Sequence, residues 1–138
     1  MSSIPAPLLT ASVTILAVFF YFYSAFRVGN LRGSLGIQAP ATTGHPIFER
    51  AYRVQLNTLE QLGMFLPLLW LTAFYPIPIA WIAPLIGLLW VVARVIYLIA
   101  YMKDPQTRLI GAMLSGLTNL ALLILAVAGV ARAWMALP

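Results

Sequence analysis

Four long apolar segments joined by short connections are the feature that most limits how this chain can fold. They cover about residues 8–27, 47–74, 79–102 and 105–133. About 20 apolar residues in a helix cross the hydrocarbon core of a bilayer, which is roughly 30 Å thick. The sequence therefore predicts an all-α integral membrane protein: one domain over residues 1–138, built as an up-and-down four-helix bundle.

The composition agrees with this and excludes other classes. The chain is 62% hydrophobic and 8% charged, with a mean hydropathy of +0.95, which is outside the range of soluble domains. The net charge of +5 reflects only three acidic residues, so we expect no nucleic-acid binding. There is no cysteine, so disulfides, thiolate metal sites and a protein thiol nucleophile are excluded. We expect no metal, and any thiol chemistry must use sulfur from a bound molecule.

The connections carry information about orientation. The first apolar segment is interpreted as a membrane anchor rather than a signal peptide, because no positive charge precedes it and it is longer than a typical signal-peptide core. Residues 28–47 are rich in glycine, proline and threonine and are predicted to form a loop. The first and third connections hold the positive residues Arg27, Arg32, Lys103 and Arg108. Both connections are therefore predicted to face the cytoplasm, with both termini on the opposite side.

The start of the fourth helix has recognisable signals. Asp104 and Pro105 are predicted to be its N-cap and first residue. Gly111, Ser115 and Gly116 form a stretch of small residues that favours close helix packing.

Polar residues enter the second and third apolar segments in stripes. Read as a helix, Glu49, Arg53, Asn57 and Glu60 fall within an arc of roughly 80°. On the third segment Arg94, Tyr97 and Tyr101 fall within roughly 60°. Charged groups are costly in hydrocarbon, so both stripes are expected to face the bundle interior.

An up-and-down bundle brings these stripes to one membrane face. The polar residues expected there are Arg32, Glu49, Arg50, Arg53, Asn57, Glu60, Arg94, Tyr97, Tyr101 and Arg108. The cations outnumber the acids, which suits a small zwitterionic ligand with excess carboxylate. A purely structural interpretation remains for single residues: Glu49 and Arg53 can pair within their helix, and Arg50 and Arg94 can be anchors that extend to the membrane surface.

Two motifs carry a family resemblance. Residues 48–60 read Phe-Glu-Arg-Ala-Tyr-Arg-Val-Gln-Leu-Asn-Thr-Leu-Glu, and Arg94, Tyr97 and Tyr101 are followed by Arg108. Together with Pro-Ala-Thr-Thr-Gly at 40–44, this pattern resembles the MAPEG family, the membrane-associated proteins in eicosanoid and glutathione metabolism. It is most similar to the microsomal glutathione transferase and leukotriene C synthase branch.

The resemblance implies a homotrimer with glutathione, as co-substrate, bound between neighbouring protomers. The residues that it implies for holding glutathione are Arg32, Arg53, Asn57, Glu60, Arg94, Tyr97 and Tyr101. Arg108 is implied as the catalytic residue that stabilises the thiolate. An apolar electrophile or lipid hydroperoxide would reach the sulfur from the bilayer, in an active site on the cytoplasmic side.

Three positions differ from the eicosanoid branches. Gly33 follows Arg32 in place of a second arginine, Gln61 replaces an aromatic residue, and Leu109 replaces a serine. These differences favour a general glutathione transferase or peroxidase. Two alternatives stay open: a non-catalytic lipid-binding scaffold, which would not need Arg108, and a proton-coupled transporter using Glu60 as its intramembrane acid.

Overall fold

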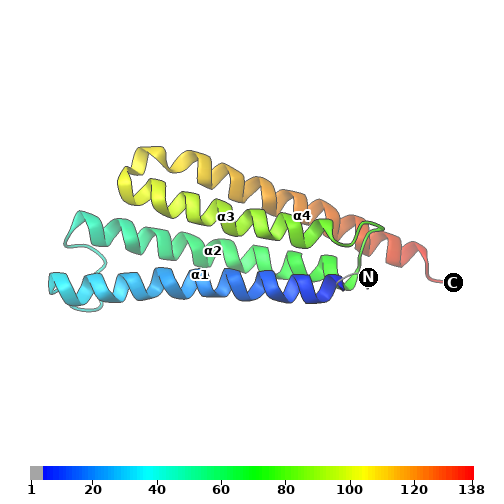
Figure 1. The fold of residues 1–138 in the computed structure, drawn as a ribbon, viewed down its shortest axis with the longest axis horizontal. Helices are drawn as coiled ribbons and strands as arrows, with labels where there is room; N and C mark the ends of the chain where they lie inside the picture. Colours follow the sequence, from blue (N-terminus) through cyan, green and yellow to red (C-terminus); the bar gives the residue numbers. More distant parts are fainter. Residues whose placement is uncertain (1–4) are drawn as a thin grey trace.

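The computed structural model describes residues 5–138. Within them the chain forms α1 (Ala6–Leu35), α2 (Pro46–Phe74), α3 (Ile82–Lys103), the 3₁₀ turn η1 (Pro105–Arg108) and α4 (Leu109–Met135). The helices run alternately up and down, so the α1–α2 and α3–α4 connections lie at one end of the bundle (Figure 1). We call this the connection end; the start of α1 and the end of α4 lie at the other, the terminal end (Figure 1). The predicted all-α four-helix architecture is confirmed.

The first helix is longer than predicted. It continues from residue 27 to Leu35, so the loop prediction is wrong for residues 28–35. The glycines in this stretch do not end the helix because Val28 is buried and packs in one cluster with Phe48 and Ala51 of α2. The helix ends instead at Gly36, whose φ of +65° belongs to the left-handed region that glycine adopts without strain.

The second helix begins where the sequence predicts. His45 is its N-cap, and its Nδ1 accepts a hydrogen bond of 3.3 Å from the Ile47 N–H. The helix runs without interruption through Pro67 to Phe74. At about 1.5 Å per residue its 29 residues are longer than the hydrocarbon core of a bilayer.

The other three long helices have the length and apolarity of membrane spans. Large apolar side chains such as Phe19 and Ile110 are exposed on their outer faces, where an integral membrane protein meets lipid. A buried apolar core lies inside the bundle toward its terminal end. It is centred on Phe65 and Trp90, whose rings stack at 4.0 Å between centroids.

The last two helices differ from prediction at their ends. Helix α3 begins at Ile82 rather than 79, because a turn precedes it in which the Ile82 N–H donates to the Ile79 carbonyl over 3.1 Å. Asp104 is an N-cap as predicted, accepting from the Gln106 N–H at 2.9 Å. The turn that it caps is 3₁₀, and α4 proper then continues to Met135.

Only two of the three small residues predicted to form a packing face on α4 lie against the rest of the bundle. A Cβ added at Gly111 would lie 2.6 Å from the Tyr97 Cα, so α4 crosses α3 in close contact there, and Ser115 is buried on the same side. Gly116 is exposed, with open space where its Cβ would be. That part of the prediction is wrong, because residue 116 is one position, or about 100°, further around the helix than Ser115.

Candidate functional site

Two adjoining cavities lie at the connection end of the bundle. The smaller one, which we call the polar cavity, has a volume of about 400 Å³. Its lining residues are Arg53, Leu56, Asn57, Glu60, Tyr97, Tyr101 and Arg108. Six of the eight predicted site residues therefore meet in one cavity. The α3 stripe is buried in the bundle as predicted. The charged residues of the α2 stripe, Glu49, Arg53 and Glu60, are exposed on the protomer, so the prediction that this stripe faces the bundle interior is wrong.

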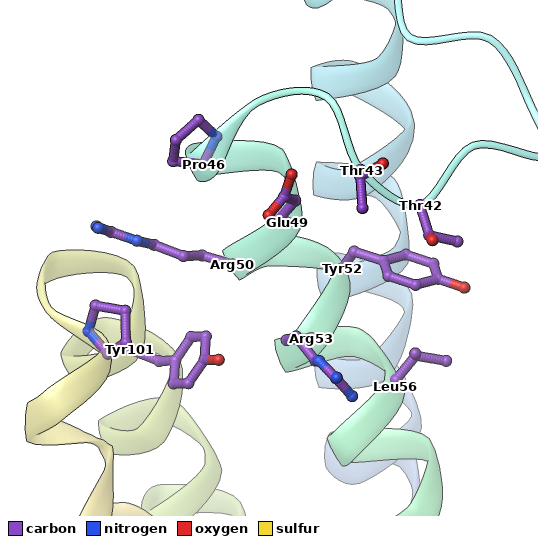
Figure 2. Close-up of a pocket in the computed structure, with 10 residues that line it drawn as sticks. Thr42, Thr43, Pro46, Glu49, Arg50, Tyr52, Arg53, Leu56 and Tyr101 are labelled. Atoms are coloured by element: carbon purple, nitrogen blue, oxygen red, sulfur yellow. The ribbon is translucent and has the colours of Figure 1, made fainter.

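The second cavity, which we call the outer cavity, has a volume of about 650 Å³ and shares Arg53, Leu56 and Tyr101 with the first. Its other lining residues are Thr42, Thr43, Pro46, Glu49, Arg50, Tyr52 and Pro105. In Figure 2 the Tyr101 ring extends from α3 toward α2, which carries Arg53. The outer cavity adds threonine hydroxyls from the α1–α2 connection, which the sequence interpretation did not include.

Helical spacing sets one wall of the polar cavity. Arg53, Asn57 and Glu60 are separated by four and three residues on α2, and this spacing places side chains on one helix face. Tyr97 and Tyr101 occupy the facing surface of α3 with their rings stacked at 5.6 Å between centroids. Both tyrosines are buried, so they form a fixed aromatic wall.

Arg108 enters the cavity from the third side. It is the last residue of η1 and immediately precedes α4, where the helix dipole favours an anion. Its guanidinium carbon lies 5.7 Å from the centroid of the Tyr101 ring, within the range of a cation–π contact. The contact of Gly111 with Tyr97 lets this end of α4 approach α3, so one glycine helps to place the arginine.

Arg94 lies behind the cavity wall rather than in it. Its side chain is 0% exposed. Its Nη1 donates to Asn57 Oδ1 at 3.0 Å and its Nη2 donates to Thr58 Oγ1 at 2.9 Å. Because it is buried inside the bundle, Arg94 is not an anchor that extends to the membrane surface.

Arg32 lies apart from both cavities. It is in the last turn of α1, with its guanidinium carbon 4.7 Å from the centroid of the Phe48 ring. Its Nη1 is buried and has no hydrogen-bond partner among residues 5–138 of the protomer. A single protomer therefore does not bring Arg32 together with the other predicted site residues.

Two charged residues of the outer cavity have clear structural roles. Arg50 Nη1 donates to the carbonyls of Met102 and Lys103 at 3.2 and 3.4 Å, which satisfies carbonyls at the end of α3. Glu49 accepts from the Gly44 N–H at 3.0 Å and thereby fixes the entry to α2. Both residues therefore have structural roles, but different ones from those predicted: Glu49 bonds the loop rather than Arg53, and Arg50 bonds the end of α3 rather than acting as a membrane-surface anchor.

Thr58 is a residue of the site region that sequence reasoning missed. It is fully buried and accepts a hydrogen bond from Arg94, but it lines neither cavity. A signal was available: a charged residue on one helix of a membrane bundle needs polar partners, and Thr58 is a hydroxyl residue on the buried face of the neighbouring helix.

The charges favour an anionic ligand that also carries one positive group. Arg53 and Arg108 line the polar cavity and Arg94 lies directly behind it, whereas Glu60 is its one acid. Three positive charges against one negative charge leave an excess of two. Arginine donors suit carboxylates, and a carboxylate such as Glu60 accepts from an ammonium.

Comparisons with known proteins identify the family to which the chain belongs. Residues 10–128 match the model of the MAPEG family. An uncharacterized protein of Synechocystis is 41% identical over 83% of this chain and 82% of its own length. Mouse microsomal glutathione S-transferase 2 is 38% identical over 92% and 85% of the two chains, and bovine leukotriene C4 synthase is 39% identical over 73% and 66%. The chain is therefore an integral membrane protein of the MAPEG family.

Proposed function

We propose that the polar cavity binds glutathione and that the protein is a membrane-bound glutathione transferase. The observation that carries this proposal is the meeting of Arg53, Arg108 and Glu60 with two tyrosines in one cavity. Glutathione has two carboxylates, one ammonium and a thiol, so its charges complement this lining. Relatives named as a glutathione S-transferase and a leukotriene C4 synthase support the same chemistry.

Each lining residue then has a chemical role. Arg53 binds a glutathione carboxylate and Glu60 binds the ammonium, in charge-assisted hydrogen bonds. Asn57 bonds a peptide or carboxylate oxygen, and the Tyr97 and Tyr101 hydroxyls supply further hydrogen bonds.

The proposed assembly is a homotrimer with glutathione between neighbouring protomers. Arg32 is remote from the cavity of its own protomer, and in this assembly it contributes to the site of a neighbour.

Arg108 is the proposed catalytic residue. A free thiol titrates near 8.5, so only a few per cent is thiolate at neutral pH. Lowering the pKa of the glutathione thiol to about 6.5 takes roughly 2.7 kcal/mol of selective thiolate stabilisation. An arginine aided by the start of α4 can supply this. The thiolate then attacks an electrophilic carbon of an apolar substrate from the bilayer, a C–S bond forms, and the leaving group departs with its electron pair.

The same thiolate can attack the O–O bond of a lipid hydroperoxide. The products are an alcohol and a glutathione sulfenic acid, which a second glutathione converts to the disulfide and water. Peroxidase activity is therefore proposed beside transferase activity.

The test is a set of conjugation and peroxidase assays on the purified protein with a panel of apolar electrophiles and hydroperoxides. We expect glutathione-dependent product formation with at least one of them. Glutathione binding without turnover on any of them would favour the lipid-binding scaffold. Substrate-driven proton flux in vesicles without conjugation would favour the transporter.

The site is proposed to face the cytoplasm, with both termini on the opposite side. Arg27, Arg32, Lys103 and Arg108 lie in or beside the α1–α2 and α3–α4 connections, which share one end of the bundle (Figure 1). The positive-inside rule favours the cytoplasm for that end. Single cysteines introduced as Gly33→Cys and Lys103→Cys should react with a membrane-impermeant reagent applied from the cytoplasm. Reaction only from the opposite face would contradict this orientation.

A further inference from the structure

The guanidinium of Arg94 connects two adjacent residues of α2. Its Nη1 donates to Asn57 Oδ1 at 3.0 Å, and its Nη2 donates to Thr58 Oγ1 at 2.9 Å. One of these partners, Asn57, lines the polar cavity. The other, Thr58, is 0% exposed. The arginine therefore joins a buried hydroxyl to an amide that faces the cavity.

This contact decides which end of the Asn57 amide is available to a ligand. An asparagine side chain has one acceptor oxygen and an NH₂ group with two donors. Arginine has donors only, so the oxygen must face Arg94. The reverse orientation would bring the amide NH₂ against the guanidinium, donor against donor. Asn57 is thereby fixed as an N–H donor for groups in the polar cavity.

The Thr58 hydroxyl is in turn fixed by its own helix. It donates to the Val54 carbonyl at 2.7 Å, which leaves its lone pairs to accept from Arg94. The direction of this acceptor is therefore set by the α2 backbone. The guanidinium is held at a second place by the Tyr97 ring, whose centroid lies 4.3 Å from the guanidinium carbon.

We infer that Thr58 and Arg94 are positioning residues that orient Asn57 as a donor toward a carboxylate or peptide carbonyl of the ligand. This inference rests on the proposed binding of glutathione in the polar cavity. Arg94 acts through Asn57 rather than by touching the ligand, because its side chain is fully buried. Thr58 acts one step further away, through the guanidinium.

Burying the Arg94 guanidinium costs free energy of folding, which indicates that it has a role in the cavity rather than in stability. Both hydrogen-bond partners of the Arg94 guanidinium are neutral, and its buried Nε has no partner in the part of the chain that the structure describes. A buried charge of this kind adds little stability compared with a well-packed apolar residue. A positive charge directly behind the cavity wall does favour an anionic ligand, and it gives the Asn57 amide a single orientation.

The test compares Thr58→Val with Thr58→Ser. Valine keeps the shape of threonine but cannot accept from Arg94, whereas serine keeps the hydroxyl. Glutathione affinity, measured by calorimetry, should fall roughly tenfold in Thr58→Val, and Thr58→Ser should recover most of it. Thr58→Ala carries the same expectation as Thr58→Val if the valine variant does not fold.

Thr72→Val is the matched control. Thr72 is buried on the same helix toward the terminal end, and its hydroxyl donates to the Leu69 carbonyl of its own helix at 2.7 Å. Its loss should change glutathione affinity little. Equal loss of affinity in Thr72→Val and Thr58→Val would mean that any buried hydroxyl of α2 matters only for packing, and would overturn the inference.

A double-mutant cycle separates positioning from general structure. If Thr58 acts through Asn57, Thr58→Val should weaken affinity much less in an Asn57→Ala background than in the wild-type protein. Additive losses, or unchanged affinity in Thr58→Val alone, would overturn the inference while the proposed function stands. A wild-type protein that binds no glutathione would overturn both.

Discussion

The two ends of the bundle use the same helices for different purposes. Toward the terminal end, Phe65 and Trp90 stack against each other in an apolar core, and a cavity of about 330 Å³ between α2 and α4 has only apolar residues in its lining. Toward the connection end, the polar cavity is lined by Arg53, Glu60 and Arg108. On α3 the apolar core gives way to polar contacts within about one helical turn, between Trp90 and Arg94.

This difference shows how a membrane bundle can tolerate a buried charge. The terminal end is held by close packing, which stabilises helices in lipid without any polar contact. The connection end contains polar groups in costly positions, such as the buried Nε of Arg94, which bonds to none of the described residues. We infer that packing at one end supports a site at the other that is built for binding rather than for stability. Substitutions at the two ends should therefore have separable effects.

The largest effect on stability is expected in the apolar core. Phe65→Ala removes the ring that stacks on Trp90 and should lower the free energy of unfolding by roughly 3 kcal/mol. This is near the lower end of the range for buried aromatic residues, because transfer of a side chain from lipid to the protein interior gains less than transfer from water. Thermal unfolding in detergent measures this. Glutathione affinity of the folded variant should be unchanged.

Phe22→Ala is the control for Phe65→Ala, because Phe22 is 71% exposed on the surface of the protomer. It should unfold at nearly the wild-type temperature. If Phe65→Ala left stability unchanged, or abolished binding in a protein that remained folded, the separation of the two ends would be incorrect.

The converse effect is expected in the polar cavity. Arg53→Ala and Glu60→Gln each remove a charge-assisted contact worth about 1.5–3 kcal/mol. Glutathione affinity should therefore fall on the order of tenfold to a hundredfold, with little change in thermal stability. Calorimetry on each purified variant measures both. Unchanged affinity in both variants would mean that the charged stripe of α2 is structural.

A smaller effect is expected where α4 crosses α3. A Cβ at residue 111 would lie 2.6 Å from the Tyr97 backbone, so Gly111→Ala should displace the start of α4 at a cost of about 1–3 kcal/mol. Turnover should fall because Arg108 is displaced with it. Gly116→Ala is the matched control, since its Cβ would meet open space, and it should behave like the wild-type protein. Similar activity in the two variants would show that this close contact does not place Arg108.

Much of the fold could be predicted from the sequence because hydropathy and turn residues mark the helices directly. The predicted second helix of 47–74 agrees closely with α2 (Pro46–Phe74). The first helix was predicted to end about eight residues too early, because glycine composition cannot show that Val28 packs against Phe48. Packing of that kind is a property of the assembled bundle.

The site was predictable where helical periodicity applies. Arg53, Asn57 and Glu60 line one cavity because their spacing places them on one face of α2. Periodicity cannot show depth, so it did not distinguish Arg108, which lines the cavity, from Arg94, which lies behind it. Periodicity within α2 and α3 also could not show that Arg32, which is on α1, lies apart from both cavities in the protomer.

The most direct test of the central claim is the ionisation of bound glutathione in the wild-type protein and in Arg108→Ala. If Arg108 stabilises the thiolate, glutathione bound to the wild-type protein should show the ultraviolet absorbance of a thiolate, with a pKa below that of the free thiol. In Arg108→Ala this absorbance should shrink and its titration move to higher pH. Turnover should fall roughly tenfold to a thousandfold while glutathione affinity changes much less, because stabilisation of the thiolate favours the reactive state. Full turnover with an unshifted thiolate titration in Arg108→Ala would mean that Arg108 does not stabilise the thiolate.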